Sequence, residues 1–340
     1  MRRQSCIGTP SPMIDLLRRP PYTIPGMKKY KLIANPAAGR GKANAAVLQV
    51  VELFKAKGAT FDLELTTAPQ QAAEIARKAL KEFDVIVAVG GDGTVNEVVP
   101  GMLFSSKPLG IIPSGSGNDF IKSLGIPNNI EKAVDIVLKG ETRVIDAGKI
   151  NGMYFANGVG IGFDAAVNRA SYEINHSKRG LWLYVCALVR TLGKYKPVPV
   201  RITINGGIME ETPFLLTIGN GTTCGGGFKL TPHARVDDGL LDVTIVKPLG
   251  IPTLLWHLPK VFLGTIDKVT NYARLMRTTR LSVASVHPIP VHVDGEVFPG
   301  DGKELEIEIV PGALTVIGNF GSSPHSAGIQ SCGVRVRQRL

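Results

Sequence analysis

Hydrophobic and polar residues follow two alternating periods along the first part of the chain. Short runs rich in β-branched residues predict buried strands, and the segments between them repeat apolar residues at the spacing of a helix. The expected strands are 28–34, 61–66, 85–89 and 108–113, and the expected helices are 45–54, 69–83, 95–103 and 130–138. This alternation predicts a parallel sheet covered by helices, so we expect residues 27–141 to form one α/β domain.

A second pattern begins near residue 142. Short strand-like runs dominate and Gly and Pro separate them, which is typical of an antiparallel β-sandwich over residues 142–310. The expected strands are 143–150, 154–159, 198–204, 214–219, 241–246, 280–286, 291–293 and 305–310, followed by a last strand at 311–320. Two apolar helices are expected near 180–192 and 250–266. The second carries Trp256 and Lys260, so it lies either at a membrane interface or in the core.

The two ends of the chain differ in composition from the rest. Residues 1–26 are rich in Pro and Arg and lack the apolar core of a signal peptide, so we expect a disordered leader. Residues 321–340 are expected to be a disordered basic tail. Of the net charge of +11, each end carries +3, which leaves +5 for residues 27–320. This balance favours an anionic partner such as nucleotide phosphates or an anionic bilayer.

Composition also argues against several classes of protein. No uninterrupted apolar run approaches the roughly 18 residues of a membrane-spanning helix, so membrane contact is expected to be peripheral. No aromatic-interleaved basic stretch indicates nucleic-acid binding. The four Cys residues have no CxxC spacing, which predicts a reduced, cytoplasmic protein. Nothing near His287 and His292 completes a zinc site.

The candidate chemistry begins where the expected strand 85–89 ends. Gly90-Gly91-Asp92-Gly93-Thr94 follows at once and leads directly into a helix-like segment. Glycines let the backbone approach a ligand, and exposed N–H groups and the helix dipole attract phosphate. Because Asp92 alone would repel phosphate, we expect a divalent cation or a transferable proton between them.

A second turn of the same kind follows the strand 108–113. Within Gly115-Ser116-Gly117-Asn118-Asp119, Ser116 can donate a hydrogen bond to phosphate, and Asn118 or Asp119 can cap the next helix. The carboxyl ends of parallel strands share one edge of the sheet, where ligands of open α/β sheets bind. We therefore expect Asp92 and Asp119 to lie close together at that edge.

These turns, together with Asn35-Pro36 and Gly39, resemble the catalytic domain of diacylglycerol kinases. More narrowly, they resemble the soluble bacterial lipid kinases related to sphingosine and ceramide kinases. The first turn is shared with NAD kinases and phosphofructokinases, but residues 237–243 and 293–296 resemble motifs of the lipid kinases' second domain. The resemblance implies transfer of phosphate from ATP with Mg²⁺, and a last strand at 311–320 that returns toward the first domain.

The resemblance also implies a role for particular residues. The candidates for holding ATP are Asn35, Thr67, Gly91, Gly93, Thr94 and Ser116. Asp92 would bind Mg²⁺ directly or through water, and Asp119 would complete an acidic network around it. Glu296 would accept the proton of the lipid hydroxyl, although its Asp294-Gly295 context alone predicts a solvated hairpin-turn residue.

A structural divalent cation in the second domain is implied as well. Asp238 would bind it with atoms of residues 235 and 240, which are Arg235 and Leu240. Many relatives have Lys where this chain has Arg235. The alternative explanation of Asp238 is a plain Asp-Gly turn between strands, which is compatible with a bound cation.

Three functions stay open on the sequence. The first is an ATP-dependent lipid kinase that acts on diacylglycerol or a similar lipid, giving phosphatidic acid or its equivalent. The second is a soluble-metabolite kinase of the NAD kinase type, and the third is a non-catalytic lipid-binding protein. Retention of Asp92, Asp119 and Glu296 argues against the third. We expect a cytoplasmic protein, peripheral at the inner membrane face; a homodimer is left open.

Overall fold

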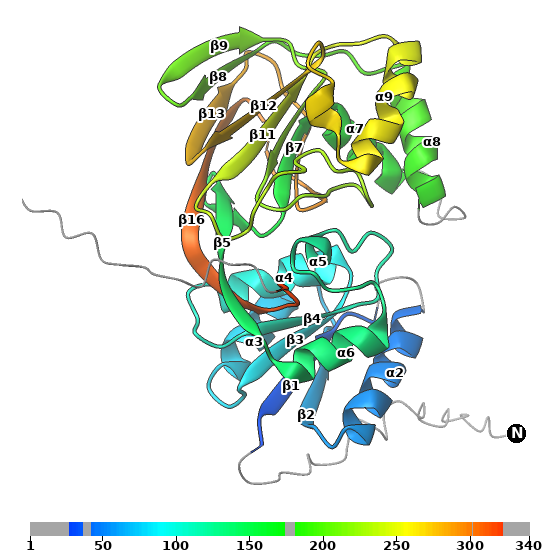
Figure 1. Cartoon of the computed structure of the whole chain (residues 1–340), viewed down its shortest axis with the longest axis vertical. Coiled ribbons are helices and arrows are strands. Elements are labelled where there is room, and N and C mark those ends of the chain that lie inside the picture. The colour runs from blue at the N-terminus through cyan, green and yellow to red at the C-terminus, as the bar shows by residue number, and fades with distance from the viewer. Residues whose placement is uncertain (1–26, 37–41, 174–180, 301, 322–340) are drawn as a thin grey trace, which may run out of the picture.

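The computed structural model describes residues 27–36, 42–173, 181–300 and 302–321, which form two lobes (Figure 1). The lower lobe is built on four parallel strands in the order β2-β1-β3-β4. These strands are β1 (Lys29–Ala34), β2 (Thr60–Leu65), β3 (Val85–Gly90) and β4 (Leu109–Pro113). Every residue of β3 is buried, as a central strand covered on both faces requires.

Helices pack against this parallel sheet. They are α2 (Lys42–Ala56), α3 (Gln71–Ala79), α4 (Asp92–Met102), the single turn α5 (Phe120–Ser123) and α6 (Ile130–Lys139). Phe54 of α2, Ile75 of α3 and Val98 of α4 are buried in one core with the strands. Gly101 lets α4 approach α3 closely, because a Cβ there would clash with the carbonyl oxygen of Ala73.

A long strand, β16 (Glu304–Ile317), connects the two lobes (Figure 1). It pairs in parallel with β4 at Val316 and antiparallel with β13 (Arg280–Ala284). Strand β5 (Thr142–Ile150) pairs with β16 on both sides of a bulge between Val310 and Leu314. The sequence predicts two strands at 305–310 and 311–320, but they form one strand because β5 pairs with both parts.

The upper lobe is a sandwich of two layers. One layer continues from β16 through β13 to β8 (Val200–Ile204) and β9 (Gly207–Glu211), while β6 (Met153–Phe155) extends β5. The other has the order β12-β11-β10-β7-β14-β15, with β7 (Gly158–Gly162), β10 (Leu215–Gly219), β11 (Leu241–Val246), β12 (Ala273–Thr278), β14 (Val291–Val293) and β15 (Glu296–Val297). Ile202 and Leu281 from the first layer share a core with Leu216 and Val243 from the second. The predicted fold class, a parallel α/β unit followed by an antiparallel sandwich, is confirmed.

Helices α7 (Phe163–Glu173), α8 (Leu181–Leu192) and α9 (Ile251–Leu263) lie together beside the second layer, with the short η2 (Ile266–Lys268) after them (Figure 1). The sequence predicts α8 and α9 but misses α7, which starts at Phe163 directly after β7, with no proline in its first turn. Strands β9, β12 and β15 are also missed. The expected strand 154–159 is instead two strands, β6 and β7, interrupted at Ala156 and Asn157.

Candidate active site

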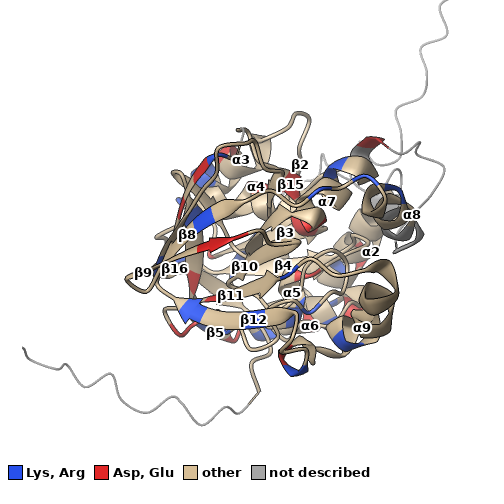
Figure 2. Ribbon diagram, turned by 90° about the horizontal axis from the view of Figure 1, so that it is seen from above, with Lys and Arg blue, Asp and Glu red and all other residues tan. Residues whose placement is uncertain are grey.

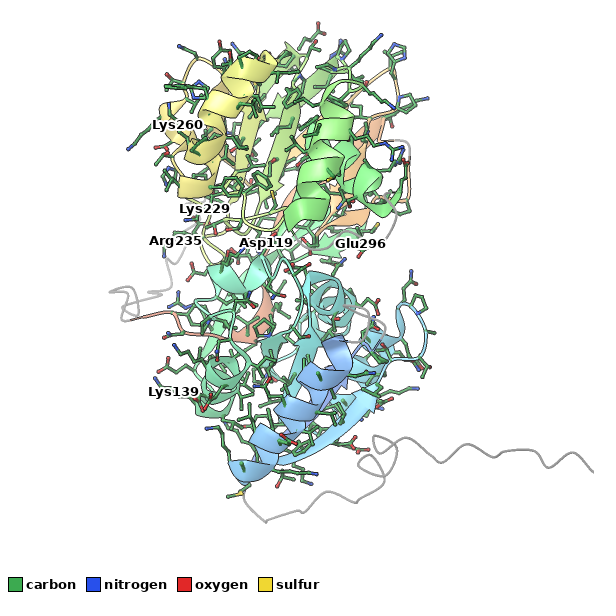
Figure 3. All side chains as sticks on the ribbon, turned by 90° about the vertical axis from the view of Figure 1, so that its right-hand side faces the viewer. Asp119, Lys139, Lys229, Arg235, Lys260 and Glu296 are labelled. Carbon is green, nitrogen blue, oxygen red and sulfur yellow. The ribbon has the colours of Figure 1, made fainter. Side chains whose placement is uncertain are left out.

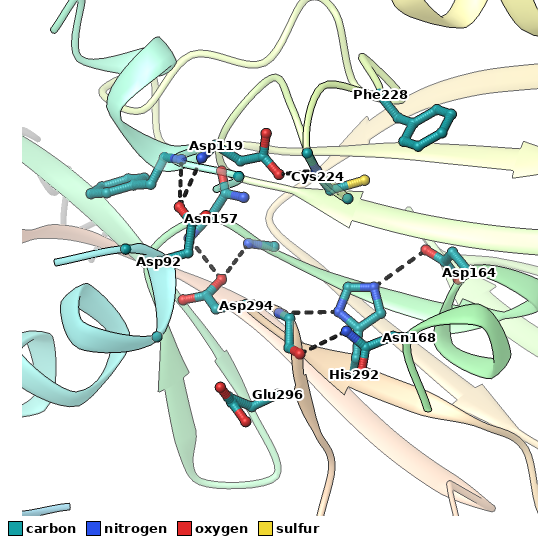
Figure 4. A pocket seen from close by; sticks show the side chains of 18 of the residues that line it. Asp92, Asp119, Asn157, Asp164, Asn168, Cys224, Phe228, His292, Asp294 and Glu296 are labelled. Carbon is teal, nitrogen blue, oxygen red and sulfur yellow. Dashed lines mark hydrogen bonds and ion pairs between the residues drawn. The ribbon is translucent and has the colours of Figure 1, made fainter. Parts of the chain in front are cut away.

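A cavity of about 860 Å³ lies between the two lobes (Figure 4). The parallel register aligns Ala34 with Val89 and Gly90 with Pro113, so the turns after β1, β3 and β4 meet at one edge of the sheet. That edge forms the polar end of the cavity. The predicted site residues that line it are Asn35, Gly91, Asp92, Gly93, Thr94, Ser116, Asp119 and Glu296.

Asp92 is tied to the second glycine turn. Its Oδ1 accepts the N–H groups of Asp119 at 2.8 Å and Phe120 at 3.3 Å. The cap of α5 is therefore the Asp92 carboxylate, and the expectation that a side chain of Asn118 or Asp119 caps this helix is wrong. Burial, with the neighbouring Asp119 carboxylate, raises the pKa of Asp92. The predicted proximity of Asp92 and Asp119 is confirmed.

Asp119 connects the lower lobe to the upper one. Its Oδ1 accepts Lys122 Nζ at 2.6 Å, and its Oδ2 accepts the N–H of Gly226 at 2.6 Å (Figure 4). Gly226 belongs to the upper lobe, in the segment between β10 and β11. This carboxylate thus fixes the position of an upper-lobe loop over the glycine turns.

The oxygen atoms at this end suit a divalent cation bound together with phosphate. Mg²⁺ prefers oxygen ligands and usually binds one or two carboxylates plus phosphate and water oxygens. The Oδ2 of Asp92 faces Gly117, and the hydroxyl of Thr94 is buried without a hydrogen-bond partner among the described residues. No group of three or more His, Cys, Asp or Glu side chains in the described ranges could hold a metal alone. A cation here would therefore need ligand or water oxygens.

Asp294 carries an enclosed carboxylate, and the sequence does not mark it as a site residue. It accepts the N–H groups of Ala156 at 2.8 Å, Asn157 at 3.0 Å and Gly158 at 2.7 Å. Burial raises the pKa of Asp294 to about 6, although these three N–H groups act in the opposite direction. The carboxylate fastens the β14–β15 turn to the loop between β6 and β7.

Gly295, the residue before Glu296, is held from both sides. Its N–H donates to Nδ1 of His292 at 3.3 Å, and its carbonyl accepts Nδ2 of Asn168 at 2.7 Å. Nε2 of His292 lies 3.5 Å from Oδ2 of Asp164 (Figure 4). His292 thus lines the cavity, and its ring connects Gly295 to Asp164.

Glu296 carries an exposed carboxylate that reaches across the cavity to the lower lobe. A Cβ placed on Gly93 would lie 3.4 Å from its Oε1, so the upper-lobe glutamate meets the first glycine turn. Asp294 and Gly295 both have positive φ, at 47° and 84°, as a tight hairpin turn requires. Glu296 is therefore both a hairpin residue and a residue of the cavity wall.

The other end of the cavity is apolar. It is lined by side chains from α7, α8, α9, β10 with the residue before it, and the β10–β11 segment, namely Phe163, Val167, Leu188, Phe214, Leu215, Phe228, Leu230, Leu254, Leu258 and Val261. The rings of Phe163 and Phe214 stack with centroids 4.3 Å apart. The cavity therefore joins a carboxylate-rich end to a chamber suited to hydrocarbon.

The remaining predicted site residues lie outside the cavity. The backbone N–H and hydroxyl of Thr67 lie 2.7 Å and 3.1 Å from Oε1 of Gln71. Asp238 accepts the N–H of Leu240 at 3.1 Å, and its other oxygen lies 3.7 Å from Nη1 of Arg277. Arg235 lies 3.6 Å from Asp237. Since Arg277 already places a positive charge beside Asp238, this geometry does not require a second cation, and the metal-binding role of Asp238, Arg235 and Leu240 stays a prediction.

Comparisons with known proteins agree with this architecture. The family model described as "Diacylglycerol kinase catalytic domain" matches residues 29–150, and "YegS C-terminal NAD kinase beta sandwich-like domain" matches residues 157–318. The chain is 36% identical over 293 residues to a protein named diacylglycerol kinase from Bacillus subtilis, which covers 82% of this chain and 94% of that protein. A diacylglycerol kinase from Mycobacterium tuberculosis is 32% identical over 85% of this chain and 94% of its own. The crystal structure of a diacylglycerol kinase from Bacillus anthracis superimposes with a TM-score of 0.67 at 27% identity, covering 86% of this chain and 98% of that one.

Proposed function

Because the chain belongs to the diacylglycerol kinase catalytic-domain family, we propose that it transfers the γ-phosphoryl group of ATP to a hydroxyl of diacylglycerol or a similar lipid. The product would be phosphatidic acid or its equivalent. The observation that carries this proposal is the two-ended cavity, with carboxylates at the glycine turns and apolar side chains opposite them. A lipid acceptor uses both ends, whereas a soluble dinucleotide would leave the apolar end without a function.

The lower lobe would bind the nucleotide. Gly91 and Gly93 allow a close approach of phosphate to the backbone, and Asn35, Thr94 and Ser116 add polar side chains at the same edge. Mg²⁺ held by Asp92, with Asp119 beside it, would neutralise the charge of the phosphates. Thr67 does not line the cavity, so it would contact a part of the nucleotide that extends beyond it.

The upper lobe would bind the acceptor and start the transfer. The acyl chains would occupy the chamber around Phe163 and Phe214, and the hydroxyl would then lie near Glu296, which lines the same cavity. Glu296 accepts the hydroxyl proton as the lipid oxygen bonds to the γ-phosphorus, and the bond from that phosphorus to the bridging oxygen breaks to release ADP. His292 and Asn168 hold Gly295 and so orient the glutamate.

The proposal is tested with purified protein, labelled ATP and Mg²⁺. The acceptors are diacylglycerol, a sphingoid base, phosphatidylglycerol and a polyprenol in detergent micelles, with NAD as a soluble acceptor, and products are identified by mass. We expect label in a phospholipid and none in NAD, and a rate of lipid labelling about 10²–10⁴-fold lower with the Glu296→Gln variant. Labelled NADP would favour the soluble-metabolite kinase, and no product with any acceptor would favour the non-catalytic protein. The enzyme would work in the cytoplasm at the inner membrane face.

A further inference from the structure

Helix α9 is apolar on two opposite sides. Leu254, Leu258 and Val261 line the cavity from one side of the helix. On another side, the exposed fractions of Leu255, Trp256 and Leu263 are 54%, 77% and 72%, and no residue of α9 is buried. A helix that is hydrophobic all round is normally enclosed by protein or lipid. Within the described part of the chain, the Leu255–Trp256–Leu263 side, here called the outer face of α9, is left uncovered.

The charges around the outer face suit an anionic surface. No Asp or Glu occurs between Asp242 and Asp267, whereas Lys247 and Lys260 lie within that stretch. Lys260 is the single charged residue of α9, which is otherwise tan in Figure 2. The exposed Lys229 is joined to the helix by its N–H, which donates to the carbonyl of Val261 at 3.1 Å. Figure 3 places Lys229 and Lys260 on the same side of the upper lobe.

The size of α9 decides how it would meet a bilayer. Its 13 residues make a helix about 20 Å long, which is shorter than the hydrocarbon core. None of the helices in the described ranges has the length and apolarity to cross a membrane. Trp beside Leu, with Lys at the margin, is the composition of a helix that lies in the plane of a membrane interface.

We propose that α9 is the membrane-docking element: its outer face inserts into an anionic bilayer, and its inner side guides the lipid from the bilayer into the cavity. This inference rests on the proposed lipid kinase function. One helix with one side in the bilayer and the other in the cavity wall gives a hydroxyl-bearing lipid an apolar route to the carboxylates. The acyl chains then never cross bulk water.

The position of Trp256 can be measured directly. The chain has two Trp residues, so a Trp182→Phe variant leaves Trp256 as the sole indole. With vesicles of phosphatidylcholine and phosphatidylglycerol, we expect its emission to shift to the blue and to be quenched by brominated acyl chains. Vesicles of phosphatidylcholine alone should bind more weakly because they lack the anionic headgroups. Vesicle binding without a change in Trp256 emission would overturn the proposal.

A paired set of variants separates docking from chemistry. Leu255→Ser with Trp256→Ser should reduce binding to anionic vesicles at least tenfold, since two large apolar side chains no longer enter the bilayer. The matched control is Ile208→Ser with Val286→Ser, which removes two residues that are 68% and 85% exposed elsewhere in the upper lobe. The control should bind like the wild type. Equal binding by the α9 variant would refute the proposal.

Activity distinguishes a failure of docking from a failure of the proposed function. On a short-chain, monomeric diacylglycerol the α9 variant should match the wild type, whereas on vesicles its rate should fall together with binding. If the wild type phosphorylates no lipid, the proposed function fails and the vesicle measurements still decide the docking proposal. If the wild type forms a dimer in solution that the α9 variant does not form, and binds no vesicles, the outer face is a self-association surface and the docking proposal is wrong.

Discussion

The buried carboxylate of Asp294 should make the stability of the protein fall as pH rises. The pKa of Asp294 is about 6 in the folded protein, against 3.8 for the ordinary side chain, because burial disfavours the charged form. The folded state therefore retains a proton that the unfolded chain has already lost at pH 5. The stability linked to that proton is fully present below about pH 3.8 and disappears as pH rises through about 6.

The size of the effect follows from these two pKa values. A pKa of about 6 in place of 3.8 corresponds to about 3 kcal/mol. About 2 kcal/mol of this is lost between pH 4 and pH 7.5. For a protein of this length, such a loss lowers the Tm by about 3 °C.

An Asp294→Asn variant isolates the contribution of this one group. Asn tolerates the positive φ of 47° at this position and keeps the volume of the side chain, but it does not titrate. Loss of one acceptor for the N–H groups of residues 156–158 shifts the Tm by an amount that does not depend on pH. Relative to the wild type, the Tm of the variant should therefore rise by about 3 °C from pH 4 to pH 7.5.

Thermal unfolding of both proteins at several pH values, without nucleotide or metal, is the measurement. Groups common to both proteins cancel in the difference. The control is Asp84→Asn. A hydrogen bond from the N–H of Lys29 lowers the pKa of Asp84, so the ionised Asp84 stabilises the fold and this stabilisation is lost only as the pH falls below 3.8. Its Tm curve should run parallel to that of the wild type over the whole range. A parallel curve for Asp294→Asn as well would refute the reasoning.

Three further variants test the chemistry in an assay with ATP, Mg²⁺ and dispersed lipid. Asp92→Asn should lower kcat about 10²–10³-fold without lowering the Tm, since it removes only a charge. An unchanged kcat would show that the first glycine turn is not part of the phosphate-binding site. Glu296→Gln should lower kcat about 10²–10⁴-fold and leave the KM for ATP unchanged, and a change within about threefold would reduce it to a hairpin residue. Asn168→Leu breaks the 2.7 Å bond to Gly295 and should lower kcat by up to about 10²-fold at constant KM for ATP; a lower Tm with full kcat would make its role purely structural.

Local sequence signals were sufficient for the lower lobe and its glycine turns. The run from Val85 to Val89 has no polar residue and stops at two glycines, which is enough to predict a buried parallel strand and a turn at its end. Because parallel strands expose their carboxyl ends at one edge, the sequence alone is enough to place Asp92 and Asp119 together. Both inferences use residues that are close in the sequence or aligned by simple sheet geometry.

The side of the cavity formed by the upper lobe depends on contacts that no local pattern encodes. Asp294 bonds to Ala156 across 138 residues, and Asp119 bonds to Gly226 across 107. Periodicity identifies a strand but not its partner, so the sequence could not place Asn168 beside Gly295. A polar residue in a tight turn also looks the same whether it faces solvent or a cavity. To identify Asp294, one would need to know that residues 156–158 enclose this turn, and the sequence does not show that contact.

The two ends of the cavity are held together by different forces. At the polar end, Asp92, Asp119 and Asp294 each accept backbone N–H groups from another segment, and such bonds fix positions to a fraction of an ångström. At the apolar end, the wall is made by side-chain packing, and part of it comes from α9, which has no buried residue and offers few directional contacts. Dispersion contacts tolerate acyl chains of different lengths, whereas the short bonds do not tolerate a displaced carboxylate. For the proposed lipid acceptor, this division would keep one geometry at the hydroxyl while the rest of the lipid varies.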